Sequence, residues 1–360
     1  MRKIALVLAM LLLVSMAVFA GGRRQADDQV RIALMMRNMD EQFLADYAAN
    51  VMRLAAERGV TLNVQDAGGD AAAQLTQVQT LLVQGFRYFV IVPVVSELSD
   101  QFNSLIHAEG GAAAYSNIQP TTSSLLVGPN FFFASSPEFV AGRYQAQLMA
   151  SFFERHPERA PGRVINMLLI NGELGHPAQV NRRAGLMHEL AALGFTVNIV
   201  AEGTANWNPD ESLDLTNAWV AAFAGQFNAI AAQNDGMALG AVQALLQNGL
   251  FSDANLPTGT RLNVPVLGID ATAAALASMA AYELYATVLQ DAIGQSTAAF
   301  DVIYQVATGT RVPGAPAGGF PAATVPIDEF PANDARVINQ CFLVPFLPVD
   351  RHSDFFRASR

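Results

Sequence analysis

Short apolar runs alternate along the chain with segments in which apolar residues recur at helical spacing. The run Val-Arg-Ile-Ala-Leu-Met-Met at 30–36 predicts a buried strand, and the apolar positions from Phe43 to Leu54 predict a helix that ends at Gly59. The run at 88–92 is almost wholly apolar, as a strand covered on both faces of a parallel sheet requires. Further strands are predicted at 61–64, 112–115, 163–170, 195–200, 229–232, 264–268 and 284–289, and further helices at 74–83, 96–109, 137–154, 177–193, 209–223 and 237–246.

This order of elements predicts an α/β fold, because parallel strands joined by right-handed crossovers place helices on both faces of a sheet. One series of strands and helices ends near residue 115 and a second begins near residue 137. The chain is also longer than a single core usually fills. We therefore expect two doubly wound parallel-sheet lobes. Residues 309–340, rich in Pro, Gly and Ala, are expected to form loops with short strands.

The N-terminus departs from this pattern. Met1-Arg2-Lys3 precedes an unbroken apolar run from Ile4 to Ala20, which is followed by Gly21. A basic start, an apolar stretch and small residues at its end predict a signal peptide at 1–20 that is removed on export, with a retained N-terminal anchor as the alternative. No Cys lies near residue 20, so a lipoprotein is not expected. Later apolar runs are short, and we expect a soluble periplasmic protein.

Composition narrows the classes of function. The chain has 31 acidic and 21 basic residues and a net charge of −10, which makes it a poor partner for nucleic-acid phosphates. Cys341 is the single cysteine, so no intrachain disulfide is possible. The five His are scattered, and no CxxC, HExxH, GxxxxGK[ST] or GxSxG motif occurs. We therefore expect neither a metal site nor a cofactor.

Polar or aromatic side chains follow many of the predicted strands, where ligands of such sheets bind. They lie at 40–43, at 175–177 with Arg182, and at 206–208, 233–235, 268–270 and 290–291. Any one group alone is more typical of a helix N-cap, and Trp207 alone could be a core residue. Their shared location favours a binding site for a polyhydroxylated ring. Carboxylates, amides and a guanidinium pair with vicinal hydroxyls, while Phe43 and Trp207 offer flat faces to a sugar.

Several segments resemble the type I periplasmic sugar-binding proteins of ABC transporters, above all their galactose/glucose-binding branch. They are QLTQVQTLLVQGFRYFVIVP (74–93), GHPAQVNRRAGLMHEL (175–190), TANWN (204–208), AAQNDGMALGAVQAL (231–245), VPVLGIDAT (264–272) and YATVLQDAIGQ (285–295). The resemblance covers most of the mature chain. It implies two α/β lobes joined by a three-strand hinge. Residues 30–115 plus 291–340 would form the N-terminal lobe, and 116–290 plus 341–360 the C-terminal lobe.

The resemblance also implies a site and a role. Phe43 and Trp207 would sandwich a monosaccharide. Its hydrogen-bonding partners would be Glu41, His176, Arg182, Asn234, Asp270 and Gln290. The implied protein is a monomer, without catalytic residues, that delivers a galactose- or glucose-like hexose to an ABC permease. A sensor that serves a chemoreceptor or sensor kinase, and a binder of a pentose or another small polar solute, are the alternatives. An enzyme with Asp270 and Glu41 as a glycosidase pair is disfavoured, because the whole set matches a binding pattern.

The chain departs from that branch at several ligand positions. Glu41 stands where the hexose binder has an aspartate, and Gln290 stands where it has an asparagine. Val92 and Ala178 replace polar ligands. The stretch 155–162, where the family has a calcium loop, lacks the spaced acidic oxygens that calcium needs, so no calcium is expected. With two hydrogen-bonding groups lost, the identity of the sugar stays open.

Overall fold

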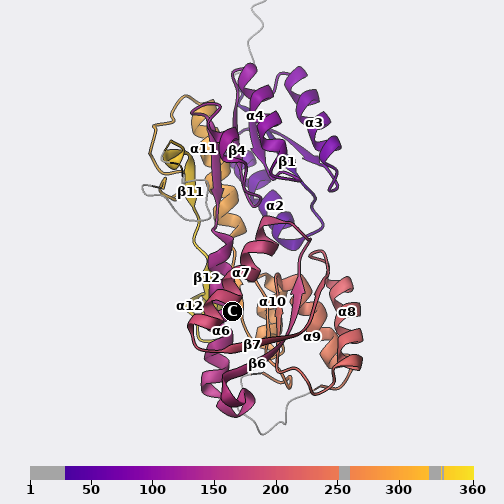
Figure 1. Cartoon of the computed structure of the whole chain (residues 1–360). Helices are drawn as coiled ribbons and strands as arrows, with labels where there is room; N and C mark the ends of the chain where they lie inside the picture. The colour runs from indigo at the N-terminus through magenta and orange to yellow at the C-terminus, as the bar shows by residue number, and fades with distance from the viewer. Residues whose placement is uncertain (1–28, 251–259, 324–333, 335) are drawn as a thin grey trace, which may run out of the picture.

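The computed structural model describes residues 29–250, 260–323, 334 and 336–360, and it shows two lobes, one above the other in Figure 1. The predicted signal peptide at 1–20, and with it the prediction about a lipid anchor, lies outside the described residues. Within the part of the chain that is described, no helix is both long and apolar enough to span a membrane.

The first lobe is built on a parallel sheet in the order β11-β5-β4-β3-β1-β2. Its strands are β1 (Arg31–Met36), β2 (Thr61–Asp66), β3 (Tyr88–Ile91), β4 (Ala112–Tyr115), β5 (Phe131–Ser135) and β11 (Cys341–Leu343), and its helices are α2 (Gln42–Glu57), α3 (Ala71–Val83), α4 (Leu98–Ala108), α5 (Thr122–Leu125) and α11 (Ala292–Ala307). Alternate residues of β1 face opposite cores. Ile32 and Leu34 pack with α2 and α11, while Ala33 and Met35 pack with α3 and α4.

The second lobe repeats this plan around a parallel sheet in the order β7-β6-β8-β9. Its strands are β6 (Val164–Asn171), β7 (Thr196–Thr204), β8 (Ala229–Ala232), β9 (Val266–Leu267), β10 (Thr287–Leu289) and β12 (Leu347–Val349), and its helices are α6 (Glu138–Arg155), α7 (Pro177–Ala192), α8 (Pro209–Ala222), α9 (Asp235–Gln247), α10 (Ala273–Ala280) and α12 (Asp354–Ala358). Leu168 and Ile170 of β6 pack with α8 and α9, whereas Met167 and Leu169 pack with α6 and α7. The predicted α/β fold with doubly covered parallel sheets is confirmed.

In its described part the chain passes between the lobes at 136–137, 290–291 and 344–346. Ser136 joins two of these crossings and also contacts α11. Its hydroxyl donates to the carbonyl of Val344 at 2.6 Å and accepts from Nε2 of Gln295 at 3.0 Å. In the second lobe, β10 continues the sheet through bridges to β9 and to Asp270, and pairs antiparallel with β12. The three crossings are where the lobes can move relative to each other.

The domain boundaries drawn from the sequence need correction. Residues 116–290 and 341–360 were expected in the second lobe, but β5 pairs with β4, and β11 pairs with β5, so both strands belong to the first sheet. The Phe-Phe-Phe-Ala-Ser run of β5 is buried along its whole length, as a strand covered on both faces requires. The first crossing therefore follows Ser135 and the last follows Leu343.

Candidate ligand-binding site

One cavity between the lobes is lined by all eight predicted site residues together with Asn117 and Ala178. Glu41 and Phe43 lie at the start of α2, and Asn117 follows β4. From the second lobe, His176, Ala178 and Arg182 belong to α7 and its N-cap, Trp207 follows β7, Asn234 follows β8 and Asp270 follows β9, while Gln290 lies in a crossing. Every one of these side chains lies beyond the carboxyl end of a strand or in a crossing.

The cavity has little free room. Its free volume is about 20 Å³, which holds about one water. A solute the size of a monosaccharide therefore enters only when the lobes, or the side chains between them, move apart.

Arg182 is the polar centre of the second-lobe side. Its Nε donates to Oε2 of Glu138 at 2.7 Å, its Nη2 donates to Oε1 of Gln290 at 2.8 Å, and its Nη1 donates to the carbonyl of Gln233 at 2.5 Å. The Arg182 side chain is 4% exposed, so these bonds form in a largely water-free setting. Because charge-assisted hydrogen bonds hold three of its donors, the guanidinium is fixed before any solute arrives.

Asp270 faces the same cavity with few partners of its own. Its Oδ1 lies 3.9 Å from Nη1 of Arg182, beyond hydrogen-bond distance, and no side-chain hydrogen bond of Asp270 is found among the described residues. Burial raises the pKa of this carboxyl well above its ordinary value, Arg182 lowers it, and the charges of Asp235 and Glu41 raise it further. The backbone φ of Asp270 is 127°, a conformation that non-glycine residues rarely adopt.

Glu41 forms the acidic edge of the first-lobe side. Its Oε1 lies 3.3 Å from Nη2 of Arg37 and accepts from Nδ2 of Asn38 at 3.4 Å. The same Arg37 nitrogen lies 3.1 Å from Oε2 of Glu173, a residue of the second lobe. Burial raises the pKa of Glu41, and Arg37 partly opposes this shift. Arg37 therefore contacts Glu41 in the cavity wall and forms an ion pair with Glu173 of the other lobe.

His176 and Trp207 present unpartnered donors to the cavity. Nδ1 of His176 accepts the amide of Ala178 at 3.1 Å, so the neutral ring carries its proton on Nε2. Both this Nε2 and Nε1 of Trp207 are buried without a partner among the described residues. Burial, followed by the charges of Arg37 and Arg182, lowers the pKa of His176 well below its ordinary value. Two buried N–H groups therefore lack an acceptor, which is rare inside a folded protein.

The side chains of Asn234 and Gln290 line the cavity and also make hydrogen bonds within the protein. Oδ1 of Asn234 accepts the amide of Met237 and so caps α9, and its Nδ2 donates to the carbonyl of Trp207 at 3.3 Å. Oε1 of Gln290 accepts from Arg182, and its Nε2 donates to Oε1 of Glu138 at 3.3 Å. For Asn234 the helix-cap interpretation and the location in the cavity are both correct. Val92, a lost ligand position, is fully buried in the core.

Backbone strain gathers around the cavity. Three of its lining residues have positive φ: Asn117 at 63°, Trp207 at 64° and Asp270 at 127°. A bulky residue such as Trp207 adopts this conformation only when its surroundings enforce it. Gly172 makes room for the Trp207 ring in this position, because a Cβ there would clash with it. Strained residues of this kind cluster at ligand sites and support the assignment of this cavity.

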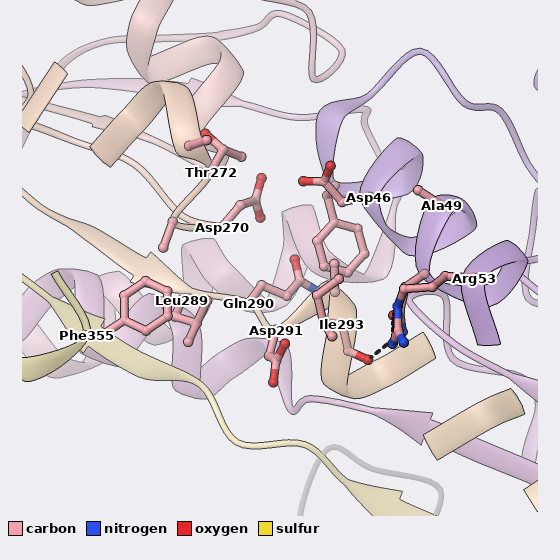
Figure 2. Close-up of a pocket in the computed structure, with 15 residues that line it drawn as sticks. Asp46, Ala49, Arg53, Asp270, Thr272, Leu289, Gln290, Asp291, Ile293 and Phe355 are labelled. Carbon is pink, nitrogen blue, oxygen red and sulfur yellow. Dashed lines mark hydrogen bonds between the residues drawn. The ribbon is translucent and has the colours of Figure 1, made fainter. Parts of the chain in front are cut away.

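A second hollow, here called the side groove, adjoins the cavity and shares Phe43, Asp270 and Gln290 with it. It measures about 430 Å³ and lies between α2 and the segment that leads into α11 (Figure 2). Asp46 from α2 and Asp270 from the second lobe point into it from opposite sides (Figure 2). The side groove has the volume of a small-molecule site, whereas the cavity has the polar groups.

The sequence predictions omitted several residues that shape the site. Asn117 lies two residues after the end of β4, so the rule that located the other strand-end residues would also have found it. Glu138, Arg37 and Glu173 are different, because each acts through a partner from a distant part of the chain. Among the described residues, no group of three or more His, Cys, Asp or Glu side chains is arranged to hold a metal ion.

Comparison with known proteins defines the family. The model of the periplasmic binding protein domain matches residues 32–311. A protein of Rhizobium meliloti assigned to rhizopine binding is 31% identical over 87% of this chain and 93% of its own length. The xylitol-binding protein of Mycolicibacterium smegmatis is 28% identical over 85% of this chain and 80% of its own. The chain therefore belongs to the periplasmic binding protein domain family.

Solved structures share the fold of this chain. An ABC transporter solute-binding protein of Bacillus halodurans C-125, with bound myo-inositol, superimposes with a TM-score of 0.73 at 24% identity. The match covers 93% of this chain and all of that one. The chain and that protein therefore share the same two-lobed fold.

Proposed function

We propose that this protein is the solute-binding component of an ABC importer, and that it closes around one small polyhydroxylated molecule, such as a monosaccharide, a sugar alcohol or a cyclitol. The observation that carries this proposal is the convergence of ten lining residues from both lobes and a crossing on one cavity. The relatives named for rhizopine and xylitol and the neighbour with bound myo-inositol widen the choice beyond a galactose- or glucose-like hexose.

The chemistry of the lining supports a polyol. Asp270 and Glu41 accept hydroxyl hydrogen bonds, whereas Nε2 of His176 and Nε1 of Trp207 donate to hydroxyl oxygens. A hydroxyl both donates and accepts, so a polyol satisfies both kinds of group at once. A solute that lacks one hydroxyl leaves a buried partner unpaired, which is how such a site discriminates among similar sugars.

The proposed mechanism is closure of the lobes. A solute enters while the crossings hold the lobes apart, then contacts Glu41 and Phe43 on one side and the Arg182 cluster on the other. Because the closed form offers contacts from both lobes, the solute binds it more tightly and shifts the equilibrium towards it. The pair between Arg37 and Glu173 forms across the lobes in this closed arrangement. The permease would then recognise the closed surface of both lobes.

A thermal-shift screen over hexoses, pentoses, alditols and cyclitols tests the proposal. A solute that binds only the folded protein raises the melting temperature in a concentration-dependent way. We expect at least one polyol to do so, and we expect Asp270→Ala to abolish that shift with little change in the melting temperature of the free protein. No shift with any polyol contradicts the proposed class of solute. Turnover of nitrophenyl glycosides contradicts a protein that only binds.

A further inference from the structure

A separate pocket lies within the second lobe, away from the cavity between the lobes. It is formed by the end of α6, the turn after α10 and the chain around α12, all in the lower lobe of Figure 1. We call it the basic pocket, because its lining includes Arg155, His156, Arg351, His352 and Arg360. It measures about 270 Å³ and shares no lining residue with the cavity or the side groove. Because the second lobe supplies the whole lining, the pocket does not depend on closure of the lobes.

Arg155 and Arg351 have no acidic partner, unlike most arginines of this protein. Most arginines of the described residues form ion pairs with Asp or Glu. Neither Arg155 nor Arg351 forms one within the part of the chain that the structure describes. Asp350 is the one acidic residue in the lining, and its Oδ1 accepts the amide of His352 at 2.9 Å. Two guanidinium groups therefore face one carboxylate that is paired with neither of them.

Arg351 is partly removed from water. Burial lowers the pKa of its guanidinium, and Tyr282, Tyr285 and Asp350 oppose this shift. The charge of Arg155 lowers the pKa of Arg351 further, so the two like charges are close enough to repel each other. An anion that contacts both groups would offset the lost hydration and the repulsion together.

Both guanidinium groups keep nitrogen donors that no described residue accepts from. Arg155 donates through Nε to a carbonyl of its own helix at 3.0 Å and through Nη2 to the Tyr285 hydroxyl. Arg351 donates through Nη1 to the carbonyls of Met279 at 3.2 Å and Leu284 at 3.4 Å. Within the described residues, Nη1 of Arg155 and both Nε and Nη2 of Arg351 lack an acceptor. Planar donors of this kind match the oxygens of a carboxylate or a phosphate.

Aromatic rings form the apolar part of the basic pocket. Tyr282, Tyr285 and Phe356 line it. Tyr282 is 54% exposed, and its backbone φ is 62°, a conformation that bulky residues rarely adopt. The guanidinium carbon of Arg351 lies 4.5 Å from the centre of the Tyr282 ring. Strained residues cluster at ligand sites, and this one places an exposed ring beside an unpaired cation.

We propose that the basic pocket binds a small organic anion, with its carboxylate or phosphate group against Arg155 and Arg351 and its apolar part against Tyr282 and Phe356. This site is separate from the solute site between the lobes and does not depend on the proposed function. A neutral molecule makes no charge-assisted bond to the two guanidinium groups. Inorganic phosphate makes such bonds but leaves the rings uncovered. A molecule with both an oxyanion and an apolar body should therefore bind best.

The test is calorimetric titration of the full chain at pH 7 and low ionic strength. Phenyl phosphate, benzoate and benzyl alcohol share an aromatic ring and differ in charge, whereas inorganic phosphate has the charge without the ring. We expect one phenyl phosphate to bind per chain, with an affinity that falls as sodium chloride is added. Benzoate should bind as well. Benzyl alcohol should bind about tenfold more weakly than phenyl phosphate, or not at all, because it lacks the charge-assisted bonds.

A lipid headgroup carries the same phosphate, so a second arm separates a free molecule from a membrane surface. The protein is sedimented with vesicles of phosphatidylglycerol and phosphatidylcholine. We expect it to stay in the supernatant, because a pocket of about 270 Å³ suits a small molecule. Sedimentation with the vesicles, without binding of phenyl phosphate or benzoate, would overturn the proposal of a free anion.

Three variants locate the effect. Arg351→Met and Arg155→Met each keep the aliphatic stem and should weaken phenyl phosphate binding about tenfold or more. Arg31→Met is the matched control. Arg31 also forms no ion pair within the described residues and lies 4.1 Å from the centre of the Phe86 ring, but it lines none of the three pockets. This control should bind phenyl phosphate normally. Circular dichroism of the free variants shows whether each folds, and one folded variant of the pocket is enough for the test.

The other outcomes contradict the proposal. If neither phenyl phosphate nor benzoate binds, the basic pocket is not an anion site. If benzyl alcohol binds as tightly as phenyl phosphate, the arginines do not determine recognition. If a folded Arg351→Met or Arg155→Met variant binds phenyl phosphate as tightly as Arg31→Met does, the anion binds elsewhere. None of these results bears on the solute site between the lobes.

Discussion

The two sides of the cavity hold their polar groups in different ways. On the second-lobe side, the Arg182 side chain is 4% exposed and donates three hydrogen bonds of 2.8 Å or less. On the first-lobe side, the Glu41 side chain is 22% exposed and its two polar contacts measure 3.3 and 3.4 Å. The second lobe therefore holds its polar groups more firmly than the first lobe does. Substitutions on the second-lobe side should accordingly have the larger effects.

The largest effect is expected at Arg182. Arg182→Met keeps the aliphatic stem but leaves Glu138 and Asp270 buried without a cation, which costs about 3–5 kcal/mol of unfolding free energy. Binding of the polyol should be lost as well. The adjacent Arg183 is a matched control, because its side chain is 39% exposed and its partner Glu202 is also at the surface. Arg183→Met should cost less than about 1 kcal/mol. Equal stability of the two variants in denaturant titrations contradicts the central role of Arg182.

A smaller but clear effect is expected at Gly172. An added Cβ would lie 2.1 Å from the Trp207 ring, so Gly172→Ala must displace the indole and should cost about 1–3 kcal/mol of stability. Solute affinity should fall with it. At Gly236 the nearest atom to an added Cβ is 3.5 Å away, so Gly236→Ala is the control and should bind normally. Normal solute affinity in Gly172→Ala would show that the position of Trp207 does not matter.

His176 should make stability depend on pH. Burial keeps the imidazole neutral in the folded protein, with a pKa well below the 6.5 of the unfolded chain. The unfolded chain therefore takes up a proton that the folded protein does not, and the contribution of His176 to stability is complete above pH 6.5 and is lost as pH falls below it. Compared with His176→Gln, the wild-type protein should lose stability between pH 7.5 and 5. A constant difference between the two proteins over this range would mean that His176 titrates freely.

The smallest effect is expected at the ion pair between the lobes. The Glu173 side chain is 57% exposed, so Glu173→Gln should change solute affinity by less than about 1 kcal/mol. The change should appear as faster solute release and should shrink as salt screens the pair. Glu154→Gln, which removes a similarly exposed partner of Arg163 far from the cavity, should leave release unchanged. An equal effect of both variants on the release rate argues against a closing role for Arg37 and Glu173.

Much of the fold could be predicted from hydrophobic periodicity, and the exceptions have physical causes. Predicted strand 229–232 coincides with β8, whereas predicted strand 264–268 contracts to Val266–Leu267, because Pro265 has no amide to donate to a neighbouring strand. The prediction omitted β5, a short aromatic run between two loops, and this moved the domain boundary. The partner of such a strand is set by tertiary structure, which periodicity does not report.

The candidate site could be predicted because parallel sheets bring their carboxyl ends together. Trp207, Asn234 and Asp270 follow different strands, and the fold places them in one cavity. The ion pairs could not be predicted in this way. Glu138 is far from Arg182 along the chain, and Glu173 is farther still from Arg37, so neither pairing leaves a local pattern.

The central claim is that the solute binds in the cavity beside Trp207. The chain has two tryptophans, and Trp219 lies in the core of the second lobe, so Trp219→Phe leaves Trp207 as the only tryptophan reporter. Titration of this variant with a polyol that binds by calorimetry should change the emission of Trp207 and saturate at the same affinity. A polyol that binds by calorimetry but leaves that emission unchanged would contradict the account.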